Sequence, residues 1–179
     1  KNKEIEGENL KAISDSRNKD VFDCVIDIFV EEKGKAGIIT FSMSEENVKK
    51  LLKHKKGFIG TDGLPGEHPH PRLYGTFPRI LGKYVREEKL LSLEETLYKF
   101  TKGPAKKIGL KKRGEIKNGY FADIVIFDSE KVRDKNTFET PKILPEGILY
   151  VIVNGEIEIE NGKFTGKTGG KVLKKNEQS

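Results

Sequence analysis

Asp62 is placed in the sequence where its carboxylate could take part in a reaction. The run Phe58-Ile59-Gly60-Thr61 is short and mostly apolar, Asp62 follows it, and a stretch rich in glycine and proline (63–66) comes next. A short apolar run bounded by turn residues is typical of a buried strand. The sequence therefore predicts that Asp62 lies at the rim of a sheet, where it could accept and return a proton. The alternative is a simple turn, because Asp-Gly is a common turn pair.

The loop after Asp62 concentrates further polar groups. It contains His68, His70 and Arg72, interleaved with prolines. A guanidinium group binds a carboxylate through two parallel hydrogen bonds, so Arg72 is either a ligand for an acidic substrate or a surface residue. The His68–His70 spacing invites a metal, but no third or fourth ligand is in sight. Loop packing or substrate contact is therefore the preferred role of both histidines.

Two strands with a helix between them are expected to position Asp62. Residues 38–41 form a brief apolar run, Ser44 can cap a helix with an acidic first turn, and Gly57 ends that helix just before residues 58–61. Strand, helix and strand in this order predict a parallel pair with a helical crossover. In such α/β folds functional groups gather at the carboxyl ends of the strands, which is where Asp62 stands.

Further helices are expected before this unit. A short helix covers about residues 7–17, and Asp20 can cap a second helix that runs to about residue 32. Cys24, the only cysteine, lies in the second helix and is interpreted as a small buried hydrophobe. The apolar residues of this helix recur at helical spacing, which predicts a stripe that faces a core: Phe22, Val25, Ile26 and Phe29.

Helices are also expected after the proline-rich loop. One covers about residues 78–88, with Thr76 or a neighbour as its cap, and another follows Ser92. Ser92 and Glu95 have the spacing of a capping box. Pro104 opens a last turn that ends near residue 108. Tyr74 and Phe77, which precede the first of these helices, could line a pocket for an apolar group or pack in the core.

The last third of the chain changes character. Residues 124–127 and 148–153 are apolar runs of strand length, and Glu156-Ile157-Glu158-Ile159-Glu160 alternates as a half-exposed strand does. Asn154-Gly155 and Asn161-Gly162 are hairpin-turn pairs. We therefore predict an α/β section over residues 1–112 and a small β section with a charged tail over residues 113–179.

Composition narrows the class of protein. The 179 residues carry a net charge of +6, and charged and hydrophobic residues each make up 35% of the chain. The basic residues are interspersed with acidic ones and form no basic, aromatic-rich block, so no nucleic-acid partner is expected. No apolar run is long enough for a membrane span and no signal peptide is visible, which makes the cytoplasm the expected location.

Taken together, these residues resemble the C-terminal part of the N-acyl-D-amino-acid deacylases (D-aminoacylases) of the amidohydrolase superfamily. The sequence differs from the family pattern in having Thr61 where serine is more frequent, and in a loop before Arg72 that is about one residue shorter. The run 68–82 is specific to the deacylase branch, whereas the last two of the matching stretches occur in many amidohydrolases. The matching stretches are Phe41-Ser42-Met43-Ser44, Gly60-Thr61-Asp62-Gly63-Leu64-Pro65, His68-Pro69-His70-Pro71-Arg72-Leu73-Tyr74-Gly75-Thr76-Phe77-Pro78-Arg79-Ile80-Leu81-Gly82, Gly119-Tyr120-Phe121-Ala122-Asp123-Ile124-Val125-Ile126-Phe127-Asp128 and Val153-Asn154-Gly155.

The resemblance implies a fold and a reaction. The fold is a metal-dependent-hydrolase (β/α)₈ barrel with a small β-sandwich, of which this chain would hold the last barrel strands and helices and the C-terminal share of the sandwich. The substrate is a small N-acyl amino acid, and a zinc-bound water attacks its amide. The zinc ligands would lie mostly upstream of Lys1, so no metal ligand is assigned here. The remainder of the barrel would be the partner of this chain, which alone should be inactive.

The resemblance also assigns roles to residues. Asp62 matches the catalytic aspartate that shuttles the proton, and Arg72 matches the arginine that holds the substrate carboxylate. Together with Tyr74 and His70, Arg72 makes up our candidate substrate-binding set. Two alternatives stay open: a cyclic amidohydrolase of the dihydroorotase or hydantoinase kind, and a non-catalytic structural or association fragment.

Overall fold

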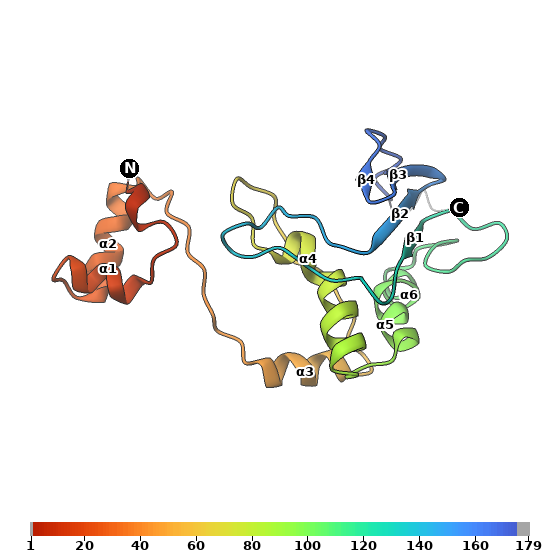
Figure 1. Ribbon diagram of the computed structural model, residues 1–179, viewed down its shortest axis with the longest axis horizontal. Coiled ribbons are helices and arrows are strands. Elements are labelled where there is room, and N and C mark those ends of the chain that lie inside the picture. Colours follow the sequence, from red (N-terminus) through yellow and green to blue (C-terminus); the bar gives the residue numbers. More distant parts are fainter. Residues whose placement is uncertain (1, 175–179) are drawn as a thin grey trace. The chain divides into compact units, whose positions relative to one another are not determined.

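The computed structural model describes residues 2–174 as helices followed by a small antiparallel sheet (Figure 1). It divides into two compact units, one ending at Met43 and the other beginning at Ser44. The predicted boundary between residues 112 and 113 lies inside the second unit and stays a prediction. The end of the charged tail, residues 175–179, lies outside the described residues. Among those residues no helix is both long and apolar enough to cross a membrane.

The first unit is a pair of helices preceded by a short 3₁₀ turn. Its elements are η1 (Lys3–Ile5), α1 (Leu10–Ser16) and α2 (Val21–Glu31). The Asp20 carboxylate accepts a hydrogen bond of 2.8 Å from the amide of Phe22, which confirms the predicted cap of α2. Cys24 is fully buried, also as predicted, and shares the small core of this unit with Ile13.

The predicted core-facing stripe of α2 is wrong for this unit. Phe22 and Phe29 are 79% and 58% exposed, and Val25 and Ile26 are 43% and 54% exposed. The buried side of α2 is instead the side that carries Cys24. The periodicity of the stripe is real, but within this unit α1 is the helix that contacts α2, and one short helix covers only one side of its neighbour.

The second unit begins with five helical elements. They are α3 (Glu45–Lys53), α4 (Arg72–Arg79), the π-helix η2 (Ile80–Glu87), α5 (Leu93–Phe100) and α6 (Lys102–Ile108). The Ser44 hydroxyl accepts a hydrogen bond from Asn47 N at 3.2 Å, as expected of the cap of α3. Ser92 and Glu95 form the predicted capping box: Glu95 N donates to Ser92 Oγ at 3.1 Å, and Ser92 N donates to Glu95 Oε2 at 3.4 Å.

The helix expected from Pro78 begins six residues earlier, at Arg72. Pro78 is therefore inside a helix rather than at its start, and the predicted cap Thr76 instead donates its hydroxyl to the carbonyl of Arg72 at 2.8 Å. Proline lacks the amide that an α-helix would bond to the carbonyl four residues earlier. The π-helix η2 follows two residues after Pro78, so the continuous rod of α4 and η2 changes its hydrogen-bond pattern next to the proline.

The two strands predicted before Asp62 are absent among the described residues. Residues 38–41 and 58–61 have an irregular backbone, so both predicted strands are wrong. A strand needs a neighbouring strand to bond its backbone, whatever its own sequence favours. In the second unit, residues 58–61 run against helices instead: Ile59 N donates to the carbonyl of Lys99 at 3.4 Å.

The predicted β section is confirmed as a four-stranded antiparallel meander of β1 (Ile124–Phe127), β2 (Ile148–Val153), β3 (Glu156–Glu160) and β4 (Lys163–Phe164). Ile124 pairs with Ile152, and Tyr150 pairs with Glu160. Both Asn-Gly turns join neighbouring strands. Asn154 and Gly155 have φ of 50° and 86°, which is the left-handed backbone that a tight hairpin turn requires.

Arg113 ties the start of this section to its first hairpin. Its side chain is 11% exposed and forms an ion pair with Asp123. It also donates to Asn154 Oδ1 at 2.5 Å, and its guanidinium carbon lies 4.1 Å from the centre of the Phe121 ring. Asp123 in turn accepts a 2.8 Å hydrogen bond from Asn154 N. These contacts join the stretches 119–128 and 153–155 in space.

We expect Arg113→Met to lower the free energy of unfolding of the full-length protein by about 2 kcal/mol, because it leaves Asp123 and Asn154 without their cationic partner. Lys111→Met, which changes an exposed residue nearby, should change stability by less than about 0.5 kcal/mol. Urea unfolding checks both variants. Equal stabilities of the two variants would contradict the role given to Arg113.

Candidate active site

Asp62 is presented to solvent by a left-handed backbone. Its φ is 47°, and its side chain is 92% exposed. Aspartate is among the few non-glycine residues that adopt this conformation. The neighbours of Asp62 support it locally, since Gly63 N donates to the hydroxyl of Thr61 at 3.2 Å. Gly63 also lies directly on α4: a side chain there would place its Cβ 2.6 Å from the Cα of Leu73.

Arg72, the first residue of α4, donates two hydrogen bonds to Asp62. Its Nε donates to the backbone carbonyl of Asp62 at 2.9 Å, and a terminal nitrogen donates to the carboxylate oxygen Oδ2 at 3.0 Å. One contact fixes the backbone and the other fixes the side chain. The two residues that the sequence singled out for proton transfer and for carboxylate binding therefore lie in direct contact.

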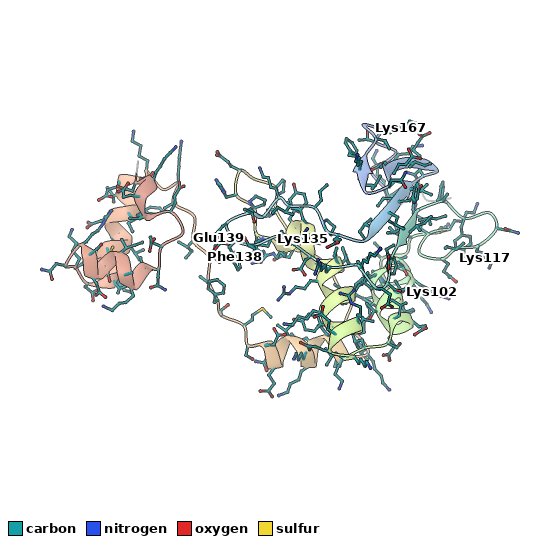
Figure 2. The ribbon with its side chains drawn as sticks, viewed as in Figure 1. Lys102, Lys117, Lys135, Phe138, Glu139 and Lys167 are labelled. Carbon is teal, nitrogen blue, oxygen red and sulfur yellow. The ribbon has the colours of Figure 1, made fainter. Side chains whose placement is uncertain are left out.

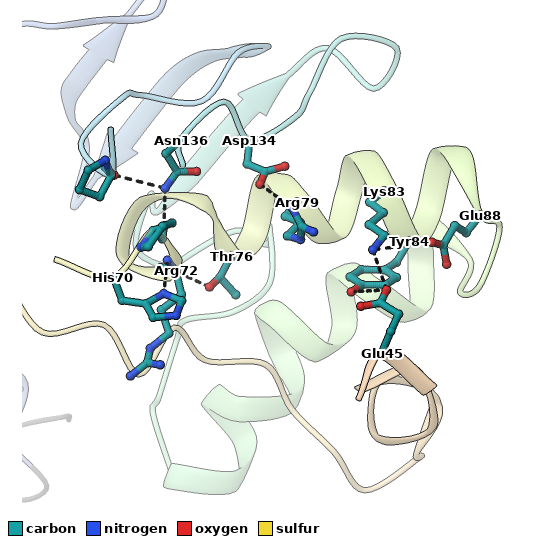
Figure 3. A network of polar contacts seen from close by, with 12 residues as sticks. Glu45, His70, Arg72, Thr76, Arg79, Lys83, Tyr84, Glu88, Asp134 and Asn136 are labelled. Atoms are coloured by element: carbon teal, nitrogen blue, oxygen red, sulfur yellow. Dashed lines mark hydrogen bonds and ion pairs between the residues drawn. The ribbon is translucent and has the colours of Figure 1, made fainter. Parts of the chain in front are cut away.

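His70 belongs to the same cluster through the backbone of Arg72 (Figure 3). Its Nδ1 accepts a hydrogen bond of 3.0 Å from Arg72 N, which places the proton of the neutral ring on Nε2. Partial burial, and then the positive charge of Arg72, lower the pKa of His70. The ring is therefore neutral at neutral pH. It packs edge-on against Phe138, with ring centres 5.1 Å apart.

Tyr74 lies on α4, two positions after Arg72 and roughly 200° around the helix axis from it, and is half-buried. Its place in a substrate site stays a prediction. Phe77 packs edge-on against Phe100 of α5, with ring centres 4.7 Å apart, so core packing describes it better than an acyl pocket does.

A segment from the β section, residues 132–141, lies along α4 and η2. Asn136 donates to the carbonyls of Pro71 and Pro141, the latter at 3.3 Å, and so holds the residue just before Arg72 (Figure 3). Asp134 forms an ion pair of 3.0 Å with Arg79. Sequence reasoning missed this segment. The signal was the glycine at position 75 inside a helix, where a side chain would overlap Asn136.

A second polar network holds the other end of the rod. Lys83 and the hydroxyl of Tyr84 both donate to Glu45 Oε1 of α3, at 2.6 and 3.0 Å (Figure 3). Burial, followed by the hydrogen bond to Glu45, raises the pKa of Tyr84. Lys49 adds a 2.8 Å ion pair to Glu88. These contacts fix α3 to η2 and leave the Asp62 end of the unit free of that network.

Two further features bear on ligands. Within residues 2–174, no group of three or more His, Cys, Asp or Glu side chains is arranged to hold a metal ion. A shallow hollow of about 340 Å³ opens beside the loop, lined mainly by Glu67, His68 and the stretch 139–143. Figure 2 labels Glu139, the first residue of that stretch, and its neighbour Phe138. Neither feature provides a ligand set for a metal.

Comparison with known proteins decides the family. A family model described as the amidohydrolase family matches residues 16–158. The chain belongs to the amidohydrolase family. It is 43% identical over 171 residues to D-aminoacylase from Alcaligenes xylosoxydans xylosoxydans, a match that covers 95% of this chain and 34% of that protein. It is 46% identical over 121 residues to an N-acyl-D-glutamate deacylase of the same organism, covering 67% and 25%.

Solved structures of the amidohydrolase family agree with the sequence matches. A D-aminoacylase structure described for its binuclear metal center superposes with a TM-score of 0.82 at 43% identity, covering 90% of this chain and 33% of that one. N-acyl-D-glutamate deacylase from Bordetella bronchiseptica, solved with zinc and a phosphonate inhibitor, gives a TM-score of 0.77 at 38% identity, covering 84% and 31%. The chain thus spans about a third of the length of these amidohydrolases.

We expect Gly75→Ala to lower the free energy of unfolding by about 1–3 kcal/mol, because the added methyl group overlaps Asn136. Gly66→Ala is the matched control, since a Cβ at Gly66 meets nothing within 4 Å. Urea unfolding of the full-length protein measures both. The combined effect of Gly75→Ala and Asn136→Ala should be smaller than the sum of the separate effects, because both changes act on one contact. Additive effects would show that Asn136 does not pack on Gly75 in solution.

Proposed function

We propose that this chain is part of a hydrolase that cleaves the acyl amide bond of N-acyl-D-amino acids. The contact between Asp62 and Arg72 carries the proposal, because it joins a proton acceptor and a carboxylate binder at one exposed rim. In the reaction water adds to the amide carbonyl and the C–N bond breaks. The products are a carboxylic acid and a free amino acid. The relatives named as deacylases of D-amino acids support this substrate class.

In this proposal Asp62 takes the proton of the attacking water and returns it to the leaving amine. Its exposed carboxylate is accessible to a ligand while Arg72 holds Oδ2. Arg72 binds the α-carboxylate of the substrate. Asp62 uses two N–H groups of the guanidinium, which has further donors, so the same fork can hold a second carboxylate. His70 acts as a neutral donor through Nε2, and Tyr74 contributes to the wall of the site.

Zinc enters the proposal through the relatives. The Bordetella deacylase was solved with zinc, and a D-aminoacylase structure is described for its binuclear metal center. The described residues of this chain do not by themselves fit such a centre, because they gather no set of three ligands. The steps assigned above therefore concern only protons and the substrate carboxylate, and we derive no step through a metal.

We also propose that the rest of a (β/α)₈ barrel completes this chain, as the sequence resemblance implied. Two observations support this. The apolar stripe of α2 is exposed within its unit, and so are Ile38 and Ile39 of the apolar run 38–41. Both are the surfaces that a barrel would cover. The sandwich share of the β section and a cytoplasmic location belong to the same proposal.

A cyclic amidohydrolase is the weaker alternative. The dihydroorotase of Lactobacillus gasseri is 34% identical over 97 residues, which covers 48% of this chain. The deacylase matches are both longer and more similar. A substrate panel of N-acyl-D-amino acids, N-acyl-L-amino acids and cyclic ureides separates the two. A non-catalytic role would show no turnover across the panel.

We expect Asp62→Asn to lower kcat of the full-length protein roughly 10³-fold on the best N-acyl-D-amino acid, because the amide cannot accept the proton. Glu67→Gln removes a carboxylate of the same loop and should retain activity within about threefold. Steady-state kinetics measures both variants. Activity of Asp62→Asn close to that of the parent would refute the assigned role, and turnover confined to cyclic ureides would refute the substrate class.

For Arg72→Met we expect KM for an N-acyl-D-amino acid to rise about 30-fold or more, because the substrate carboxylate loses its ion pair. The control substrate is the corresponding N-acyl amine, which has no carboxylate. The variant should lose little binding on it. Equal losses on the two substrates would mean that Arg72 acts only by holding Asp62.

A further inference from the structure

Lys99 is a buried charged residue that the proposed chemistry does not use. It lies on α5 and is 6% exposed. A charged group is costly to remove from water unless polar partners surround it. The ammonium group of Lys99 donates to the backbone carbonyl of His54 at 2.6 Å and to that of Gly57 at 3.0 Å. Both carbonyls belong to the turn that follows α3, immediately before the segment that ends in Asp62.

The neighbours of Lys99 hold the same segment. Ile59 N donates to the backbone carbonyl of Lys99 at 3.4 Å. Phe58 lies against Gly103 of α6, where a Cβ would come within 2.5 Å of the ring. Residues 54–59 are therefore contacted at four positions: by the side chain of Lys99 at His54 and Gly57, by Gly103 at Phe58, and by the backbone carbonyl of Lys99 at Ile59. Since residues 58–61 have no strand partner among the described residues, these contacts replace a ladder as their support.

The residue after Lys99 supports the other half of the site. Phe100 packs edge-on against Phe77 of α4, the helix that begins with Arg72. Two adjacent residues of α5 thus set the positions of the Asp62 segment and of the Arg72 helix. The capping box at Ser92 stabilises the start of α5, the helix that makes both contacts.

We propose that Lys99 is a positioning residue for Asp62. Its ammonium group fixes the turn 54–57, and with it the segment that delivers the carboxylate to Arg72. This inference rests on the proposed function for its kinetic consequence. Its structural part, the anchoring of residues 54–62, is independent of the reaction. Loss of the anchor lets the carboxylate move relative to a bound substrate, and a displacement of about 1 Å costs on the order of 10²-fold in rate.

The test compares Lys99→Met, which keeps the apolar stem and removes the charge, with Lys99→Arg, which keeps a cationic donor. Lys102→Met is the matched control, because Lys102 is an exposed lysine on α6 that pairs with Glu115 at 3.0 Å (Figure 2). All are made in the full-length protein. Hydrogen exchange of the amides of residues 55–63 and steady-state kinetics with an N-acyl-D-amino acid are measured for each. Should Lys99→Met not fold, Lys99→Gln takes its place.

We expect Lys99→Met to speed exchange at residues 55–63 by at least about tenfold while the sheet amides keep their rates. The variant should lower kcat about 10- to 100-fold with KM within about twofold, and Lys99→Arg should recover most of the loss. Unchanged exchange at residues 55–63, or faster exchange over the whole protein, would overturn the proposal, as would an unchanged kcat. If the parent protein turns over none of the substrates while the local exchange effect persists, the proposed function fails and the anchoring stands.

Discussion

The candidate site depends on the two hydrogen bonds that Arg72 donates to Asp62. An aspartate with a left-handed backbone and a side chain that is 92% exposed has little of its own to hold it in place. Arg72 supplies both restraints, because it bonds the carbonyl and the carboxylate of the same residue. The direction of the carboxylate is therefore set by the start of α4, and any force that shifts α4 also shifts Asp62.

The start of α4 is itself held by residues distant in the sequence. Asn136 reaches back to the carbonyl of Pro71, and the ring of Phe138 packs on His70. Both residues follow β1, so the β section contributes to the site without providing a reacting group. The segment before Asp62 depends in the same way on Lys99 of α5. The local motif thus provides the chemistry, whereas its geometry comes from partners 45 and 65 residues away along the chain.

The features that depend on adjacent residues could be predicted from the sequence, and those that depend on distant residues could not. The caps at Asp20, Ser44 and Ser92 and both Asn-Gly hairpins were predictable, because they depend on a few adjacent residues. The strands before Asp62 and the buried face of α2 were wrong, because each needs a neighbour that local sequence cannot specify. The start of α4 was missed because Pro78 is usually read as a first-turn residue, and here tertiary contacts tolerate it inside a helix.

The glycines of the rod carry information that the hydrophobic pattern does not. Gly75 and Gly82 are seven residues apart, which places them near one side of a helical rod. A Cβ at the first would overlap Asn136, and one at the second would lie 2.8 Å from the carbonyl of Val132. Both close contacts come from the segment after β1. Glycine lowers helix stability, so two glycines at this spacing in the rod of α4 and η2 indicate another segment of the chain packed against that side. The same spacing identifies the side on which the rod of α4 and η2 is held.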